Sequence, residues 1–233
     1  MRVLGIETAT DICSVALAAE GTVVHEIAAG TPRAHAEMLM QQITGILERQ
    51  GWGMTDLDGL AVSIGPGSFT GLRIGLAAAK GIAWARDIPL VAVPTLDALA
   101  FKTVNADLTR QGETLVTAVD SRKGEVYVQM YSLENGVAVP QGSVAISDPE
   151  EILSRLRGKQ AVVTGPSMQL RSVLVGGGSA GIRVVEGAAA SCTAGPVALL
   201  GEKRIEAGEA ADRAMLEPLY VQQFQPKLRT RMV

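Results

Sequence analysis

The stretch SIGPGSFTGLRIG, residues 63–75, indicates the fold more directly than any other part of the chain. An apolar run at residues 60–64 leads into it and predicts a buried strand. The chain then turns at residues 65–67, and residues 69–86 predict a helix rich in small side chains. A strand, a glycine turn and a helix in this order predict an α/β unit.

The beginning of this predicted helix is a candidate anion site. Backbone N–H groups are free at a helix N-terminus, where the helix dipole also favours negative charge. The residues that would form the site are Gly65, Gly67, Ser68 and Arg73. However, the stretch lacks the Gly-Lys-Ser/Thr ending of a P-loop and the G-x-G-x-x-G spacing of a dinucleotide site. A structural glycine turn and an anion site therefore both stay open.

Small residues recur along the predicted helix at intervals of four, which places them on shared helical faces. A glycine inside a helix costs about 1 kcal/mol relative to alanine, so three glycines suggest a packing reason. That reason is either close packing within the chain or contact with a helix of another protein. One face carries Gly71, Gly75 and Ala79, and a neighbouring face carries Ala77, Gly81 and Ala85.

Length and composition narrow the class of protein. The chain has 233 residues, of which 47% are hydrophobic, so it can bury a sizeable core. No apolar run approaches the roughly 20 residues of a membrane-spanning helix, and the first residues do not form a secretion signal. Cys13 and Cys192 are expected to be small buried residues in a reducing compartment. These features predict a soluble, cytoplasmic protein without membrane contact.

Charge and aromatic content argue against an independent RNA-binding protein. The net charge is −3 and aromatic residues make up 3% of the chain, whereas such proteins usually carry a basic face and stacking aromatics. Basic residues gather only near the C-terminus, at Lys227, Arg229 and Arg231. This tail is interpreted as a solvated end or, alternatively, as a contact with nucleic acid held mainly by a partner.

The pattern of strands and helices appears twice along the chain. Residues 1–104 predict the order βββαβαβα, and residues 105–233 repeat it in reduced form. In the second half, residues 136–146 predict one strand, and Ser147 with Glu150 predicts a capping box before the next helix. We therefore expect an α/β protein of two related lobes with a cleft between them.

Four segments together are similar to the bacterial TsaB family, also called YeaZ. The resemblance implies the actin-like, Hsp70-like and sugar-kinase-like (ASKHA) superfold. It also implies a role in forming threonylcarbamoyladenosine on tRNA, at the adenosine 3′ of the anticodon. Members of the family resemble the catalytic protein TsaD but are regarded as non-catalytic. The segments are VLGIETAT (3–10), SIGPGSFTGLRIG (63–75), VPTLDALA (93–100) and VDSRKGEVYVQMY (119–131).

The resemblance also implies partners and an interface. TsaB pairs with TsaD, the ATPase TsaE docks on that pair, and isolated members form homodimers, so tRNA is met only through the complex. The family assembles through its first helix and its small-residue helix. In this sequence, the interface residues implied are Ala36, Met40, Ile43, Leu47, Gly71, Gly75 and Ala79.

Metal binding is not expected. The catalytic relative carries two histidines four residues apart on one helix, where both can share an ion. The histidines of this chain are His25 and His35, and the position four residues after His35 is Leu39, which cannot bind metal. We therefore predict that the chain alone holds neither a metal nor a tightly bound cofactor.

The sequence contains few of the residues that a nucleotide-binding site of this superfold needs. Glu7 and Thr8 follow the first strand, where this superfold often places an acidic residue near the phosphates. Asp120 ends a later strand, but Arg122 and Lys123 follow it where a phosphate cradle needs bare backbone N–H groups. These residues are interpreted as a vestige of an anion or nucleotide contact within a polar patch that meets a partner. ATP or ADP is then expected only at the interface of the complex.

Two enzymatic functions are alternatives to the non-catalytic, partner-binding role that the resemblance implies. A sugar-kinase-like phosphotransferase would use the cleft with Asp120 as general base, but no glycine-lined adenosine pocket is evident. Peptidase activity is disfavoured, because the sequence offers no metal-binding histidine pair, no G-x-S-x-G elbow and no convincing cysteine–histidine set.

Overall fold

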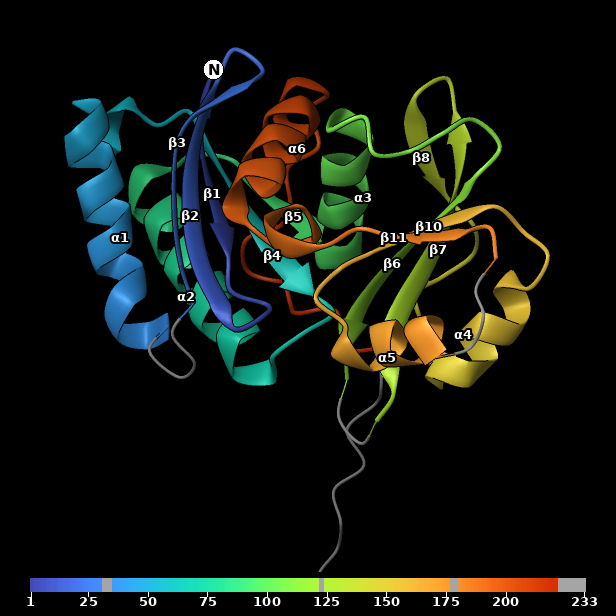
Figure 1. Cartoon of the computed structure of the whole chain (residues 1–233). Helices are drawn as coiled ribbons and strands as arrows, with labels where there is room; N and C mark the ends of the chain where they lie inside the picture. Colours follow the sequence, from blue (N-terminus) through green and yellow to red (C-terminus); the bar gives the residue numbers. More distant parts are fainter. Residues whose placement is uncertain (31–34, 122–123, 177–179, 222–233) are drawn as a thin grey trace, which may run out of the picture.

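The computed structural model describes residues 1–30, 35–121, 124–176 and 180–221. They form five layers: α1 and α2, a first sheet, α6 with α3, a second sheet, and α4 with α5, which lie below the second sheet in the view of Figure 1. Each sheet is thus covered by helices on both faces. This arrangement explains why strands of both halves read as nearly continuous apolar runs.

The first sheet has the strand order β3-β2-β1-β4-β5. β1 pairs antiparallel with β2 and parallel with β4, and β5 extends the parallel half. The hairpin between β2 and β3 turns at Glu20 and Gly21, which both have positive φ. The strands are β1 (Arg2–Glu7), β2 (Ile12–Ala19), β3 (Thr22–Gly30), β4 (Gly59–Gly65) and β5 (Leu90–Pro94).

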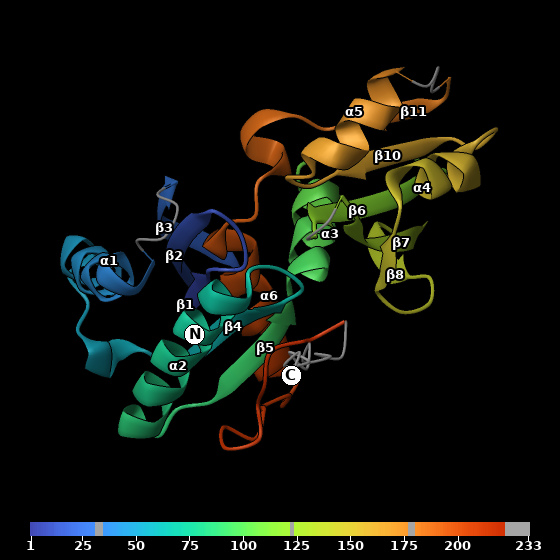
Figure 2. The same cartoon turned by 90° about the horizontal axis from the view of Figure 1, so that it is seen from below.

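Three α-helices follow these strands in the first half of the chain. α1 and α2 lie side by side on one face of the first sheet, and α3 leads from the end of β5 toward the second sheet (Figures 1 and 2). A short 3-10 helix, η1 (Met54–Asp56), precedes β4. The helices are α1 (His35–Gln50), α2 (Phe69–Arg86) and α3 (Thr95–Asn105).

The second sheet has the order β11-β10-β6-β7-β8, and β9 pairs with β7. Its elements are β6 (Thr114–Asp120), β7 (Val126–Glu134), β8 (Val137–Pro140), β9 (Ala145–Ser147), α4 (Pro149–Leu156), β10 (Ala161–Thr164), α5 (Met168–Gly176) and β11 (Ile182–Val184). The predicted repetition of the first lobe's order, and with it the two-lobe α/β class, is confirmed.

The chain returns to the first sheet through η2 (Gly187–Ala190) and α6 (Ala194–Glu206). α6 covers the face of the first sheet opposite α1 and α2, and it contacts all five strands. Gly5 and Gly201 permit this close approach: a Cβ on Gly201 would lie 2.2 Å from the Ala61 Cβ. The division at residues 104 and 105 stays a prediction, but α6 belongs to the first sheet by its packing.

The core of the first lobe has two parts because β1 is buried on both faces. Leu4 and Ile6 pack with residues of α1 and α2, whereas Val3 packs with Val197 of α6. This division follows from the alternation of side chains along a strand. Glu7 continues the α6-facing series of β1, so its carboxylate is also buried.

Two local predictions in the second half are wrong. Residues 136–146 form two short strands, β8 and β9, which pair with different parts of β7 and are separated by a turn at Gly142 with φ +81°. The capping residue of α4 is Asp148, whose carboxylate accepts a hydrogen bond from the Glu150 backbone N–H at 2.8 Å. α4 starts one residue later than the predicted box requires, because Pro149 fits the first helical position.

None of the helices in the described part of the chain combines the length and the apolarity needed to cross a membrane.

Candidate functional site

The glycines of the opening stretch seat α2 against the end of β1. A Cβ on Gly71 would lie 2.0 Å from the Thr8 carbonyl oxygen, and a Cβ on Gly75 would lie 2.2 Å from Thr8 Oγ1. At the turn itself, a Cβ on Gly67 would lie 2.2 Å from the Ala9 carbonyl oxygen. These positions accept only glycine at the observed spacing. Their placement therefore supports the structural interpretation of the glycine turn.

The N-terminus of α2 is already engaged by the chain's own groups. Ser68 is the capping residue, and its hydroxyl accepts a hydrogen bond from the Gly71 N–H at 3.3 Å. Arg73 lies with its guanidinium 3.7 Å from the Phe69 ring centroid, and its Nε donates to the Tyr220 hydroxyl at 3.1 Å. The Arg73 guanidinium is thus held by two aromatic residues rather than directed at an open anion site.

Tyr220 belongs to a segment that we call the strap, residues 209–221, which runs antiparallel along α2. The Ala211 N–H donates to the Leu90 carbonyl at 2.8 Å, and the Leu219 N–H donates to the Ile64 carbonyl at 2.7 Å. Between these points, Lys80 Nζ donates to the Ala214 carbonyl at 3.2 Å. The strap therefore lies beside α2 from its C-terminal to its N-terminal end.

At the C-terminal end of α2, Arg213 of the strap donates hydrogen bonds to the last turn of the helix and to its capping residue. Its Nη1 donates to the Ala83 carbonyl at 2.7 Å and its Nη2 to Asp87 at 2.8 Å. Its guanidinium carbon lies 5.9 Å from the Trp84 ring centroid. A cation at this end of the helix complements the helix dipole.

Glu7 and Thr8 are both fully buried at the end of β1. One carboxylate oxygen of Glu7 accepts a hydrogen bond from the Ala9 N–H, whereas Oε2 of Glu7 and Oγ1 of Thr8 have no hydrogen-bond partner within the described chain. Burial raises the pKa of Glu7 to about 7, against the weaker opposing effects of the Ala9 N–H and the Ser63 hydroxyl. Glu7 is therefore a buried acid, and none of the ion pairs between described residues includes it.

Asp120 is used to begin α5. Its Oδ1 accepts a hydrogen bond from the Ser167 hydroxyl and its Oδ2 accepts one from the Met168 N–H at 3.1 Å. Both oxygens that a general base would offer are thus engaged within the second lobe. Arg122 and Lys123 lie outside the described residues, as do the basic residues of the tail.

The two histidines lie on different elements of the first lobe. His35 is the first residue of α1 and is 7% exposed, whereas His25 is half-buried on β3. Leu39, the companion position of His35, is buried in the core. In the described ranges, no group of three or more His, Cys, Asp or Glu side chains is arranged to hold a metal ion. The predicted absence of a metal stays a prediction.

The predicted interface residues of α1 divide between core and surface. Ala36 and Met40 are exposed, and Met40 is 46% exposed. Ile43 and Leu47 are buried in the core beneath α1. The helical period does not separate them, because positions 36, 40, 43 and 47 fall on one stripe of the helix.

The two faces of small residues on α2 also differ. Gly71, Gly75 and Ala79 are buried, so their placement favours packing within the chain, the alternative weighed beside a partner contact. Ala77, Gly81 and Ala85 are exposed. No described atom lies within 4 Å of a Cβ built on Gly81, its own helix backbone apart. The smooth surface that another helix needs is therefore the second face.

Apart from Met40, sequence reasoning missed the bulky residues around this surface. Of the twelve large apolar residues exposed in the described chain, six lie on α1, α2 or the strap: Met40, Phe69, Trp84, Met215, Leu219 and Tyr220. Trp84 is 67% exposed and stands beside an open hollow of about 610 Å³, which is lined by Trp84, Asp87 and residues 211–214. We call the exposed residues Ala36, Met40, Ala77, Gly81, Trp84 and Ala85 the α1–α2 face.

Comparisons with known proteins agree with this architecture. The family model described as TsaD, tRNA N6-adenosine threonylcarbamoyltransferase, matches residues 8–211. The Escherichia coli protein named tRNA threonylcarbamoyladenosine biosynthesis protein TsaB is 38% identical over 159 residues, which are 67% of this chain and 67% of that protein. The Haemophilus influenzae protein of the same name is 37% identical over 129 residues, which are 54% of this chain and 52% of that protein.

Solved structures resemble nearly the whole chain. A Pseudomonas aeruginosa protein described as having similarity to peptidase YeaZ superposes with a TM-score of 0.80 and 26% identity, covering 95% of this chain and 99% of that one. More distant structures share the fold alone. A Clostridium difficile activator of 2-hydroxyisocaproyl-CoA dehydratase reaches a TM-score of 0.53 at 9% identity, covering 91% of this chain and 99% of that one.

Proposed function

Because the chain belongs to the TsaB (YeaZ) family of tRNA threonylcarbamoyladenosine biosynthesis proteins, we propose that it is a non-catalytic subunit that binds and activates TsaD. The fold is that of the actin-like superfamily. In the proposed role, TsaD transfers the threonylcarbamoyl group to the tRNA adenosine, and this chain supports TsaD by direct contact.

The observation that carries the proposal is the α1–α2 face. Exposed small residues at intervals of four allow a partner helix to approach closely. Trp84, three residues after Gly81 on α2, offers apolar area beside them, and Met40 is exposed on the neighbouring helix α1. Tryptophan is enriched among residues that dominate binding energy. The chain has two tryptophans, and Trp84 is 67% exposed, although tryptophan is highly buried on average.

The geometry of the vestigial residues supports the non-catalytic part of the proposal. Both carboxylate oxygens of Asp120 accept hydrogen bonds at the start of α5. Glu7 is buried, and the Arg73 guanidinium contacts Phe69 and Tyr220. None of these groups is free to act on a substrate in the described arrangement. The phosphotransferase alternative would need Asp120 to exchange its present partners for a hydroxyl of the substrate.

We extend the proposal to the further partners. TsaE docks on the pair with TsaD, and the isolated chain forms a homodimer through the α1–α2 face, which a homologous lobe of TsaD then replaces. tRNA is met through the complex. The chain alone binds no metal or nucleotide tightly, and ATP or ADP binds at the interface of the assembled complex.

Binding to purified TsaD, followed by calorimetry, tests the proposal at one residue. Trp84→Ala is expected to weaken binding by about 2 kcal/mol, or about 30-fold, because a desolvated aromatic side chain is lost at the interface. Met168→Ala is the matched control, since Met168 is 71% exposed on α5, far from the α1–α2 face. If Trp84→Ala and the wild type bind TsaD with equal affinity, the proposal that TsaD binds the α1–α2 face is wrong.

Reconstitution tests the function itself. Threonylcarbamoyladenosine formation is measured with TsaD, TsaE and a threonylcarbamoyl-AMP synthase, with and without this chain. Product that depends on the chain supports the proposal, whereas equal product without it contradicts the proposal. Rapid phosphoryl transfer from ATP to a sugar by the isolated chain would instead support the phosphotransferase alternative.

A further inference from the structure

The layer between the two sheets consists of α3 and α6, which contact each other. α3 also contacts strands of both sheets, including β4 and β5 of the first and β6, β7 and β10 of the second. The chain crosses between the lobes twice, at residues 106–113 and again at residues 185–193. How the two sheets are held relative to one another therefore depends on this layer and on these two crossings.

Asp97 of α3 joins the sheets through a chain of polar contacts. The hydroxyl of Tyr131, which is 1% exposed on β7, donates to Asp97 Oδ1 at 2.9 Å. Arg204 of α6 lies with Nη2 3.7 Å from Asp97 Oδ2, and its Nη1 donates to the Ala92 carbonyl of β5 at 2.6 Å. The contacts thus run from a strand of the first sheet, through both central helices, to a strand of the second.

Lys102 fixes the second crossing. Its Nζ donates to the Ala188 carbonyl at 2.7 Å and to the Ser191 carbonyl at 2.9 Å, just before α6 begins. One residue earlier, the Phe101 ring lies 4.8 Å from Lys203 Nζ of α6. The returning segment is therefore tied to the same helix that carries Asp97.

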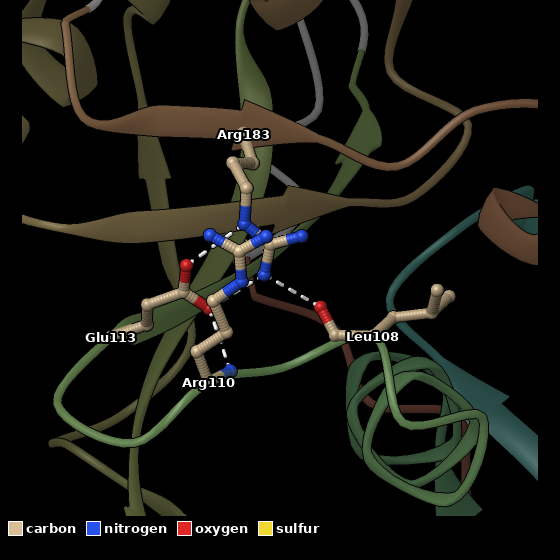
Figure 3. A network of polar contacts seen from close by, with 4 residues as sticks. All are labelled: Leu108, Arg110, Glu113 and Arg183. Atoms are coloured by element: carbon tan, nitrogen blue, oxygen red, sulfur yellow. Dashed lines mark hydrogen bonds and ion pairs between the residues drawn. The ribbon is translucent and has the colours of Figure 1, made fainter.

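The first crossing is fixed by the network that Figure 3 shows. Arg183 of β11 donates from Nε to Glu113 Oε1 at 2.9 Å and from Nη2 to Glu113 Oε2 at 2.7 Å. Arg183 Nη2 also donates to the Leu108 carbonyl at 2.8 Å, and the Arg110 N–H donates to Glu113 at 2.8 Å. A bidentate pair of this kind is geometrically specific, so the crossing segment is held to the edge of the second sheet.

Apolar contacts complete the attachment of α3 to the second lobe. Leu96 and Leu99 pack with Val119 and Cys192, and all four side chains are buried. The interior at this boundary is close-packed, and close-packed interfaces resist gradual deformation. Movement of one sheet against the other would break the polar chain and open this packing together.

We propose that Asp97, Lys102, Tyr131 and Arg204, which we call the α3 clasp, hold the two lobes at one fixed angle. The chain then acts as a rigid two-lobe body that neither opens nor closes around a ligand. A partner bound to the α1–α2 face would find the second lobe in a constant position. The inference does not depend on the proposed function, because it concerns the isolated chain.

Distance measurement between spin labels tests the clasp. Labels are placed at Thr44→Cys on α1 and Ser172→Cys on α5, which are both exposed, whereas the native Cys13 and Cys192 are buried. One narrow distance distribution is expected, and saturating ADP with Mg²⁺ should leave it unchanged. A broad or two-peaked distribution in the otherwise wild-type chain, or a shift with ADP, would overturn the inference.

Variants of the clasp make the test specific. Tyr131→Phe removes only the hydroxyl that reaches Asp97, and it is expected to about double the width of the distribution because the polar chain is cut. The control is Arg155→Ala, which breaks the exposed Arg155–Glu151 ion pair within α4 and should leave the width unchanged. A folded Tyr131→Phe chain with the wild-type width contradicts the role of the clasp. Should that variant not fold, Arg204→Met is measured in its place, with the same two outcomes.

Discussion

At the scale of single residues, Glu7 is the group whose surroundings depart most from those of an ordinary surface carboxylate. It is fully buried, one of its oxygens has no hydrogen-bond partner within the described chain, and the nearby hydroxyl of Ser63 is itself bonded to Thr95 at 2.7 Å. A buried carboxylate resists ionisation, which is why its pKa is raised to about 7.

The first prediction concerns the stability of the chain against pH. The pKa of Glu7 is higher in the folded chain than in the unfolded chain. Its contribution to the free energy of unfolding is therefore fully present below about pH 4.5 and is lost as the pH rises to about 7. The loss amounts to about 3 kcal/mol. Glu7→Gln can still accept the Ala9 N–H bond but cannot ionise. Urea unfolding at several pH values should therefore show that the free energy of unfolding of Glu7→Gln increases relative to that of the wild type as the pH rises.

The control for this experiment is Glu125→Gln, an exchange of the same kind at a partly exposed carboxylate near the end of the second sheet. Its free energy of unfolding should change with pH in the same way as that of the wild type across the same pH range. If the Glu7→Gln curve also runs parallel, Glu7 ionises freely in the folded chain and the account of its burial fails.

Residue-scale predictions from sequence succeeded where local spacing decides the outcome. Glu7 and Thr8 do lie where the first strand ends, with Glu7 as its last residue. The hydrogen bonds of Asp120 could not be predicted, because its partners Ser167 and Met168 lie at the start of α5, at least 47 residues further along the chain. Which polar groups a carboxylate meets is decided by packing between elements, and the sequence around it carries no such information.

At the scale of elements, α2 has two faces of similar composition and opposite environments. The face with Gly75 lies against Thr8, whereas the face with Gly81 is open. Both faces were evident from the spacing of small residues, but the spacing did not indicate which would meet β1. That choice depends on how α2 rotates over the sheet, which is set by Leu72 and Leu76 packing into the lobe.

The second prediction compares the same substitution on these two faces. Gly81→Ala should stabilise the chain by about 1 kcal/mol, because alanine is the better helix former and the added methyl group meets open space. Gly75→Ala should destabilise it by about 1–3 kcal/mol, because the methyl group would overlap Thr8 Oγ1. Thermal unfolding of both variants measures the two shifts. Shifts of the same sign would contradict the packing described here.

At the scale of the whole molecule, the repeated order of elements was predictable because each strand and helix carries its own periodic pattern. The position of α6 was not. Its sequence predicts a helix, but nothing local indicates that it crosses back to cover the first sheet, 100 residues after that sheet is complete at Pro94. Long-range packing of this kind depends on matching surfaces, here the small residues Gly5 and Gly201.

The third prediction follows for fragments of the chain. Residues 1–104 alone should not unfold cooperatively, because the sheet face lined by Val3, Ala61 and Val91 would be open to solvent. The same fragment joined through a flexible linker to residues 190–208 should recover a cooperative transition in urea, followed by circular dichroism. Cooperative unfolding of residues 1–104 by themselves would show that α6 is dispensable for the first lobe.

The late position of α6 also has a consequence for biosynthesis. A ribosome finishes the five strands of the first sheet about 100 residues before it reaches this helix, which at ordinary rates of translation leaves roughly 10 s of delay. During that time the nascent polypeptide carries an apolar sheet surface with nothing to cover it. Chaperones that hold unfinished chains therefore have a defined target here, and ribosomes stalled before α6 should accumulate them.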